Sequence, residues 1–131
     1  MRQLQLQTDK MLAHVEDGVG WITFNQPKKR NAVSFAMWQA IPEIISDFAS
    51  SDDVRVVVMR GAGDKAFVSG ADISEFEEVR NTPEQVVIYE NATSAANAAL
   101  RTLDKPLIAM VRGFCIGGGM AIALSADLRI T

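Results

Sequence analysis

The feature of this sequence that most constrains its fold is a repeated unit, in which a largely apolar strand runs into a glycine-rich loop and then a helical segment. Residues 54–59 (VRVVVM) lead into the loop RGAGDKAFVSGADI, and residues 107–111 (LIAMV) lead into a second glycine loop about fifty residues later. Strands with so many adjacent apolar residues have no solvated face, which is typical of a covered parallel sheet. The repeat therefore predicts an α/β fold of stacked ββα or βα units.

A β-hairpin and a further strand flank the two repeated units. Residues 11–24 (MLAHVEDGVGWITF) contain two runs of β-branched and aromatic residues around Asp17-Gly18, a dipeptide that suits the positive φ angles of a tight turn. Residues 128–131 (LRIT) have the pattern of another strand. We expect the hairpin before the first unit and the additional strand after the second.

Two helices are predicted between the strands. Apolar residues recur every three or four positions from about residue 34 to residue 50, which predicts an amphipathic helix, and Pro42 should kink it. Thr82-Pro83-Glu84-Gln85 has the pattern of a helix start, with threonine as the N-cap and glutamine at the capping-box position. The second helix is therefore expected to begin after Thr82.

Composition and charge exclude several classes of protein. The 131 residues are 48% hydrophobic and 22% charged, which predicts one globular domain at most. The net charge is −3, and the only basic cluster is Lys28-Lys29-Arg30, so no nucleic-acid partner is expected. The first residues lack the apolar core of a signal peptide, and no apolar run approaches the ~20 residues of a membrane span. We therefore expect a soluble cytoplasmic protein with no membrane partner.

The chain contains one cysteine, Cys115, in an apolar context. A single cysteine cannot form an internal disulfide, and in such a context it behaves as a small buried hydrophobe. A catalytic thiol is the less favoured interpretation.

The first glycine loop resembles a nucleotide-binding motif in composition but not in context. Residues 61–66 (GAGDKA) fit the dinucleotide pattern GxGxxA after a strand, which keeps a nicotinamide-binding domain as an alternative. That motif must open a long helix, whereas here the loop continues as AFVSGAD. No GK[ST] follows either glycine run, and the only histidine, His14, lies in the hairpin, which disfavours a serine hydrolase.

Together, the segments VSGADI and IGGGMA indicate a different chemistry. Each lies where a buried strand gives way to a helical segment, so each can direct a backbone N–H into one cleft. Two converging amides form an oxyanion hole, which needs N–H donors and small residues beside the bound carbonyl. The alternative is that both are ordinary tight turns with closely packed glycines.

The segments VRVVVMRGAGDKAFVSGADISEF and KPLIAMVRGFCIGGGMAIALSADLRI resemble the enoyl-CoA hydratase/isomerase (crotonase) family, and NQPKKRNAVSFAMW agrees with the family's early N-A motif. The resemblance implies a crotonase-like spiral of ββα turns, the ClpP/crotonase fold. It also implies that residues 1–131 are the N-terminal part of a single spiral domain, incomplete without a C-terminal helical part. The family binds acyl-CoA thioesters and assembles as homotrimers or dimers of trimers.

The resemblance also assigns site residues. The backbone N–H groups of Ala71, in GAD, and Gly118, in GGG, are expected to hold the thioester oxygen and stabilise an enolate. Other residues are expected to line the substrate or contact the CoA phosphates: Val68, Gly70, Asp72, Ile73, Gly117, Lys28 and Arg30, with Lys29. The basic turn can equally be a solvated surface turn. No metal or permanently bound cofactor is expected, since the coenzyme A thioester is the substrate.

One position departs from the family's hydratases. Their pattern GGGxE places a catalytic glutamate where this chain has Ala121, and alanine cannot transfer a proton. Chemistry that needs one base, such as double-bond isomerisation, is then as well supported as hydration. A second acid is expected about twenty residues further on, beyond Thr131, so the 131 residues alone should be inactive.

The acids that are present have structural interpretations. Asp72, Glu75, Glu77 and Glu78 follow the first glycine loop, where capping or a solvated helical face is favoured over a catalytic base. Asp127 is expected to cap or pair near the next strand. A different class of function remains open, that of a non-catalytic protein which binds CoA ligands.

Overall fold

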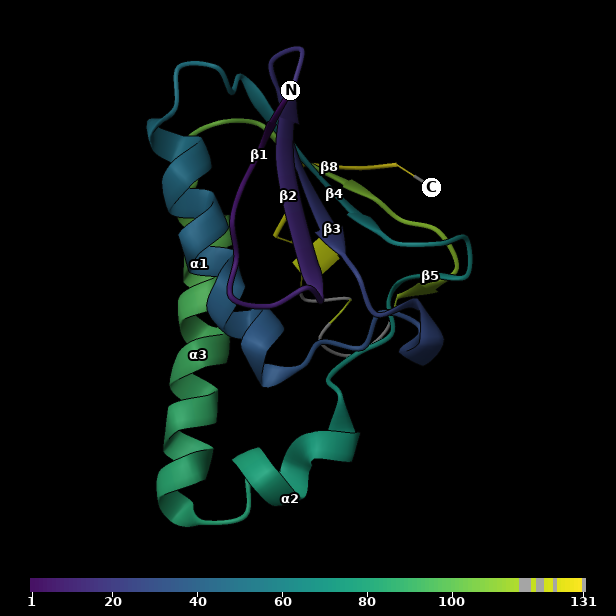
Figure 1. The fold of residues 1–131 in the computed structure, drawn as a ribbon, viewed down its shortest axis with the longest axis vertical. Helices are drawn as coiled ribbons and strands as arrows, with labels where there is room; N and C mark the ends of the chain where they lie inside the picture. Colours follow the sequence, from purple (N-terminus) through teal and green to yellow (C-terminus); the bar gives the residue numbers. More distant parts are fainter. Residues whose placement is uncertain (116–118, 120–121, 124, 131) are drawn as a thin grey trace.

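The computed structural model describes residues 1–131 except 116–118, 120, 121, 124 and 131. Figure 1 shows a sheet with helices α1 and α3 lying side by side along one of its faces. The strands are β1 (Arg2–Gln3), β2 (Met11–Glu16), β3 (Val19–Phe24), β4 (Val56–Gly61), β5 (Ala66–Val68), β6 (Leu107–Met110), β7 (Phe114–Cys115) and β8 (Leu128–Ile130). The helices are α1 (Phe35–Ser50), α2 (Phe76–Val79) and α3 (Pro83–Thr102), with 3₁₀ turns η1 (Pro27–Lys29) and η2 (Ile73–Glu75).

The main sheet has the order β1-β2-β3-β4-β6-β8. Strands β2 and β3 form the predicted antiparallel hairpin, with positive φ at Asp17 and Gly18. Strands β3, β4, β6 and β8 are mutually parallel, as the apolar strands predicted. Strand β4 begins two residues later than predicted, at Val56, and the Arg55 N–H before it donates to the Gly18 carbonyl oxygen at 2.8 Å.

The two long helices begin at the predicted residues. Ser34 caps α1, where its hydroxyl accepts from the Met37 N–H at 3.4 Å. At the start of α3, the Thr82 hydroxyl accepts from the Gln85 N–H at 3.1 Å, and the Gln85 side chain accepts in return from the Thr82 N–H at 3.3 Å. This reciprocal capping box satisfies two of the amides that a helix start leaves unpaired. Helix α1 runs through Pro42 to Ser50, and the kink stays a prediction.

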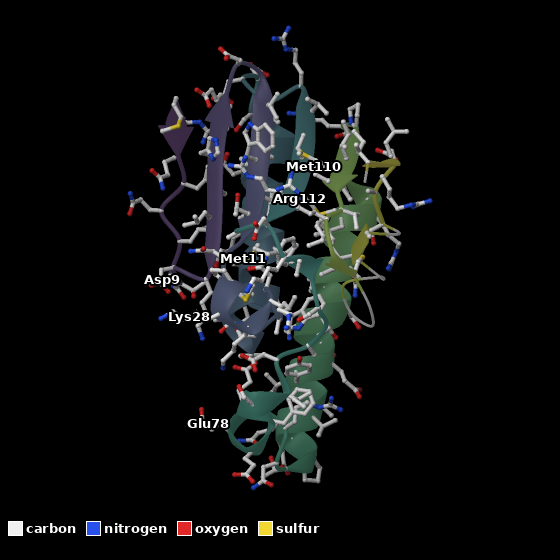
Figure 2. All side chains as sticks on the ribbon, turned by 90° about the vertical axis from the view of Figure 1, so that its right-hand side faces the viewer. Asp9, Met11, Lys28, Glu78, Met110 and Arg112 are labelled. Carbon is white, nitrogen blue, oxygen red and sulfur yellow. The ribbon has the colours of Figure 1, made fainter. Side chains whose placement is uncertain are left out.

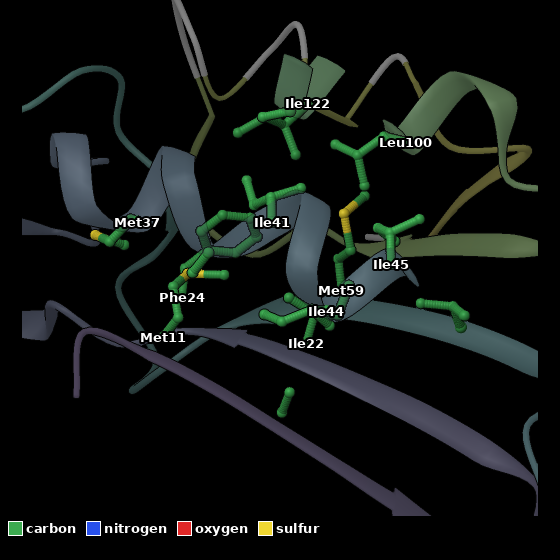
Figure 3. Packing of buried hydrophobic residues seen from close by; sticks show 14 of the residues in the cluster. Met11, Ile22, Phe24, Met37, Ile41, Ile44, Ile45, Met59, Leu100 and Ile122 are labelled. Atoms are coloured by element: carbon green, nitrogen blue, oxygen red, sulfur yellow. The ribbon is translucent and has the colours of Figure 1, made fainter. Parts of the chain in front are cut away.

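The hydrophobic core lies between the main sheet and helices α1 and α3 (Figure 3). Fully buried side chains come from the sheet, from both helices and from the segment that follows β7: Ile22, Phe24, Met59, Leu107, Ile41, Ile44, Phe48, Leu100 and Ile122. Full burial of one such side chain contributes about 1.5–3 kcal/mol. Ile122 therefore packs the segment that follows β7 into the same hydrophobic core as α1.

A second, smaller sheet consists of β5 and β7, which pair in parallel. The chain leaves the main sheet at the end of β4, enters β5, and repeats this step from β6 to β7. The two predicted units thus stack on each other in both sheets. Over the part of the chain that the structure describes, no helix combines the length and apolarity that crossing a membrane requires.

Candidate active site

Ala71 follows β5 and forms an isolated parallel β-bridge with Val33. The bridge uses the groups on either side of Ala71: the Val33 N–H donates to the Gly70 carbonyl oxygen at 2.8 Å, and the Asp72 N–H donates to the Val33 carbonyl oxygen at 2.9 Å. The N–H of Ala71 itself is directed away from the bridge. Among the described residues, no acceptor is hydrogen-bonded to it. A fixed amide without a protein acceptor, on a partly exposed residue, is what an oxyanion donor requires.

The turn that leads to Ala71 depends on Gly70. Its φ of 130° lies in a region that residues with a Cβ rarely adopt. Just before it, the Ser69 N–H donates to the Arg30 carbonyl oxygen at 3.2 Å. Residues 69–72 are therefore held along one side by the segment that precedes α1.

Asp72 is buried, with 4% of its surface exposed. One carboxylate oxygen accepts from the N–H and hydroxyl of Ser74, and the other lies 3.3 Å from Lys29 Nζ. Burial alone would raise the pKa of this carboxyl, but the hydrogen bonds from Ser74 and Lys29 hold the pKa below its usual value. The Asp72 side chain is thus an ionised cap of η2, and its predicted place along the ligand stays a prediction.

The other acids of this segment have structural contacts or are solvated. Glu75 accepts a hydrogen bond from the N–H of Phe35, the first residue of α1, where a carboxylate also complements the helix dipole. Burial raises the pKa of Glu75, and the nearby charge of Asp72 adds to the increase. Glu77 and Glu78 are exposed on α2. These placements agree with capping and a solvated helical face.

The structure separates the three residues of the basic turn. Lys28 and Arg30 line a recess of about 290 Å³, together with Asp64, Lys65 and the backbone of the first glycine loop. Lys29 points instead to Asp72 and Ser74. The recess therefore carries three cationic side chains and one carboxylate, a composition that suits a phosphate-bearing ligand.

A larger cavity, of about 460 Å³, lies at the carboxyl ends of β4, β6 and β8. Arg60, Met110, Arg112 and Ile130 are among its lining residues. Met110 and Arg112 lie together in Figure 2, apart from Lys28 in the same view. Ala71 lines neither this cavity nor the recess beside Lys28, so the larger hollow is not the predicted oxyanion site.

Val68 and the second glycine segment approach each other closely. Val68 is fully buried in β5, and a Cβ on Gly119 would overlap the Val68 carbonyl oxygen. Gly119, Ile122 and Ala123 are helical, so this glycine lets the helical segment pack against the β5 backbone. Ile73, by contrast, is 74% exposed. Gly117, Gly118 and Ala121 lie outside the described residues, and their roles stay predictions.

The dinucleotide interpretation of the first glycine loop is wrong. After Gly63 the chain enters strand β5 at Ala66, where that fingerprint requires a long helix. His14 lies on β2, stacked on Trp21 with ring centroids 6.2 Å apart, which is a strand-surface role. Asp127 accepts from the Leu107 N–H at 2.8 Å and so has the predicted structural role beside a strand.

Asn31 is a structural residue for which we predicted no role beyond its place in the N-A motif. It is fully buried, and its Nδ2 donates to the carbonyl oxygens of Ala62 and Ala66, each at 2.9 Å. Its Oδ1 accepts from the Gln26 N–H at 2.9 Å. Asn31 thus joins the loop before α1 to the first glycine loop. Its φ is 57°, a left-handed value that asparagine tolerates.

Cys115 lies partly buried in β7, and burial raises the pKa of its thiol. A raised pKa keeps the thiol protonated and weakens it as a nucleophile. This agrees with the structural interpretation of the cysteine.

Comparison with known proteins decides the family. The sequence model of the enoyl-CoA hydratase/isomerase family matches residues 14–131. The chain belongs to this family. Among family members, the short-chain-enoyl-CoA hydratase of Clostridium acetobutylicum is 37% identical over 127 residues, which cover 95% of this chain and 47% of that protein. The hydroxycinnamoyl-CoA hydratase-lyase of Pseudomonas fluorescens is 36% identical over 119 residues, 88% of this chain and 43% of that protein.

The fold agrees with the family. A crystal structure of an enoyl-CoA hydratase/carnithine racemase from Magnetospirillum magneticum superposes with a TM-score of 0.88 at 34% identity, covering 97% of this chain and 46% of that one. The predicted crotonase-like α/β fold is therefore confirmed. The chain spans about half the length of the curated relatives it matches.

Proposed function

We propose that the protein binds acyl-CoA thioesters and stabilises a thioester enolate between the backbone N–H groups of Ala71 and Gly118. The observation that carries this proposal is the Ala71 amide, which the Val33 bridge fixes without using its hydrogen. Hydrogen bonds to the thioester oxygen strengthen as negative charge develops on it. Loss of one such donor costs about 3 kcal/mol of transition-state stabilisation.

The nucleotide end of coenzyme A would occupy the recess beside the basic turn. Lys28 and Arg30, joined by Lys65, present positive charge there, and cationic side chains pair well with phosphate oxygens. The thioester arm would then run past the residues that lead to the oxyanion donors: Val68, Gly70, Asp72, Ile73 and Gly117. Coenzyme A enters this scheme as part of the substrate, with no permanently bound cofactor.

The reaction belongs to the hydratase/isomerase type. Hydration by paired acids needs a carboxylate at the position of Ala121, where this chain offers no proton-transfer group. Isomerisation of a double bond needs one base, which we place about twenty residues beyond Ala121 in the whole protein. The whole protein would work as a cytoplasmic homotrimer or dimer of trimers.

A non-catalytic protein that binds CoA ligands is the second candidate, and the alanine at position 121 is the observation that favours it. The two candidates differ in the residue about twenty positions beyond Ala121. A glutamate or aspartate there supports an enzyme. A residue that cannot transfer a proton supports a binding protein.

The test of the proposed function is titration of the whole protein with acetoacetyl-CoA. An oxyanion hole favours the enolate of this ligand, which has its own ultraviolet band. We expect the band to grow to saturation with added protein. Absence of both the band and binding at millimolar ligand would exclude the proposed site.

A further inference from the structure

The segment that carries Ala71 is held by the segment before α1 at three successive places. Ser69 is hydrogen-bonded to the Arg30 carbonyl, and Ala71 is bridged to Val33. The third contact is made by side chains, where Lys29 reaches Asp72. The direction of the Ala71 N–H is therefore set by residues some forty positions earlier in the chain, 43 for the pair Lys29–Asp72.

The Asp72 carboxylate is contacted by Lys29, by Ser74 and by Gln26, whose Nε2 donates to Asp72 Oδ2 at 3.4 Å. Lys29 Nζ lies 3.3 Å from Asp72 Oδ2 and donates to Ser74 Oγ at 2.8 Å, while the Ser74 hydroxyl donates to Asp72 Oδ1. The Asp72 side chain is 5% exposed, and that of Lys29 is 49% exposed. A buried carboxylate is strongly disfavoured without a charged or hydrogen-bonding partner. Lys29 is the only cation within salt-bridge distance of Asp72 among the described residues.

Lys28 differs from Lys29 although it precedes it directly in the same 3₁₀ turn. Lys28 lines the recess with Arg30 and Lys65, whereas the ammonium group of Lys29 forms an ion pair with the Asp72 carboxylate. The two neighbouring lysines thus allow one experiment to separate ligand binding from site geometry.

We propose that Lys29 is a positioning residue, whose ammonium group, acting through Asp72, fixes the Ala71 N–H toward the thioester oxygen. This inference rests on the proposed function and adds Lys29 to the residues that orient the oxyanion donor. The geometric demand is strict, because a displacement of about 1 Å at a reacting centre lowers rates by roughly 100-fold. Lys29 touches neither substrate nor reacting atoms in this scheme, so its loss changes enolate formation more than ligand affinity.

The experiment compares variants of the whole protein by titration with acetoacetyl-CoA and with acetoacetyl-pantetheine, which lacks the nucleotide phosphates. For each variant, the ligand dissociation constant and the enolate absorbance at saturation are measured separately. In Lys29→Met we expect the enolate fraction at saturation to fall by about 10- to 100-fold with both ligands, while the dissociation constant changes by less than about 3-fold. Lys29→Arg, which keeps the charge, should recover most of the loss.

Three further substitutions serve as comparisons. Lys28→Met should weaken acetoacetyl-CoA more than acetoacetyl-pantetheine, as expected for a phosphate contact. Arg101→Gln removes an exposed charge in the last turn of α3 and controls for the change in net charge. Asp72→Asn keeps the side-chain size, removes the other half of the ion pair, and should lower the enolate fraction as Lys29→Met does.

The outcomes distinguish this inference from the function on which it rests. If the wild-type protein gives no enolate band with either ligand, the proposed function fails. If the wild type gives the band and Lys29→Met does not lower it, the positioning role of Lys29 is wrong, whether or not Asp72→Asn lowers the band. If Lys29→Met weakens only acetoacetyl-CoA, as Lys28→Met is expected to do, Lys29 is a phosphate ligand and the inference is overturned.

Discussion

Val33 and Ala71 form a parallel β-bridge whose two hydrogen bonds leave the Ala71 N–H unused. The bridge joins the residue before the N-cap of α1 to the loop after β5, so the helix start and the candidate oxyanion donor share one rigid connection. An amide held in this way needs no reorganisation when charge develops on a bound oxygen.

Removal of the Ala71 N–H should impair catalysis and leave the bridge in place. Ala71→Pro removes that hydrogen and no hydrogen-bonding group of the bridge, which uses the Gly70 carbonyl and the Asp72 N–H, while the proline ring also fixes φ at position 71. We expect kcat to fall by about 100-fold, equivalent to about 3 kcal/mol. Ala71→Gly keeps the N–H and should lose much less. Equal losses in the two variants, with circular dichroism unchanged, would show that the amide is not a donor.

Asn31 should contribute strongly to stability. Asn31→Ala removes three hydrogen bonds of a buried side chain and places alanine at a φ of 57°. We expect the free energy of unfolding to fall by about 2–4 kcal/mol, measured by chemical denaturation. Asn91→Ala, at an exposed position of α3, is the matched control and should change stability by no more than about 0.5 kcal/mol. Similar effects in both variants would contradict the role given to Asn31.

Stability should fall in acid partly through Asp72. The pKa of this carboxyl is lower in the folded protein than in the unfolded chain, so its ionisation stabilises the fold above the unfolded value, about 3.9, and this stabilisation is lost as pH falls further. Unfolding free energies of wild type and Asp72→Asn should therefore differ most near neutral pH and converge below about pH 4. Glu77→Gln, at an exposed acid, is the control. A difference that does not change with pH would argue against the ion pair.

Hydration should be slow because position 121 lacks an acid. We expect the whole protein to turn over crotonyl-CoA slowly, and Ala121→Glu to raise the hydration rate relative to isomerisation of a 3-enoyl-CoA. Product formation by each reaction can be followed by chromatography of the thioesters. Wild-type hydration at the rate of an efficient hydratase would contradict the importance given to Ala121.

Local patterns predicted much of the fold. The hairpin at Asp17-Gly18 and the capping box at Thr82 depend on residues adjacent in sequence, and both are confirmed. The start of β4 was predicted two residues too early, at Val54 in place of Val56. Apolar patterns report burial, and they carry no information about the residue at which a strand begins to pair with its neighbour.

The candidate site was predictable in its backbone part and less so in its side chains. The motif GAD indicated Ala71. The different contacts of Lys28, which lines the recess, and Lys29, which pairs with Asp72, could be seen only in the folded structure, because Lys29 and Asp72 lie 43 residues apart in the sequence. A run of like charges in a sequence has no feature that distinguishes a paired lysine from a ligand-facing one. Asn31 was overlooked for the same reason, because its acceptors lie 31 and 35 residues away.

The most direct test of the central claim is the infrared stretching frequency of the thioester carbonyl in a bound acyl-CoA, labelled with ¹³C at that carbon. In the proposed site, hydrogen bonds from the N–H groups of Ala71 and Gly118 would polarise the C=O bond and weaken it. We predict that the band of the ligand bound to the whole protein lies at lower frequency than in water, and that Ala71→Pro reduces the shift. A bound carbonyl that absorbs at or above its frequency in water would contradict the oxyanion hole.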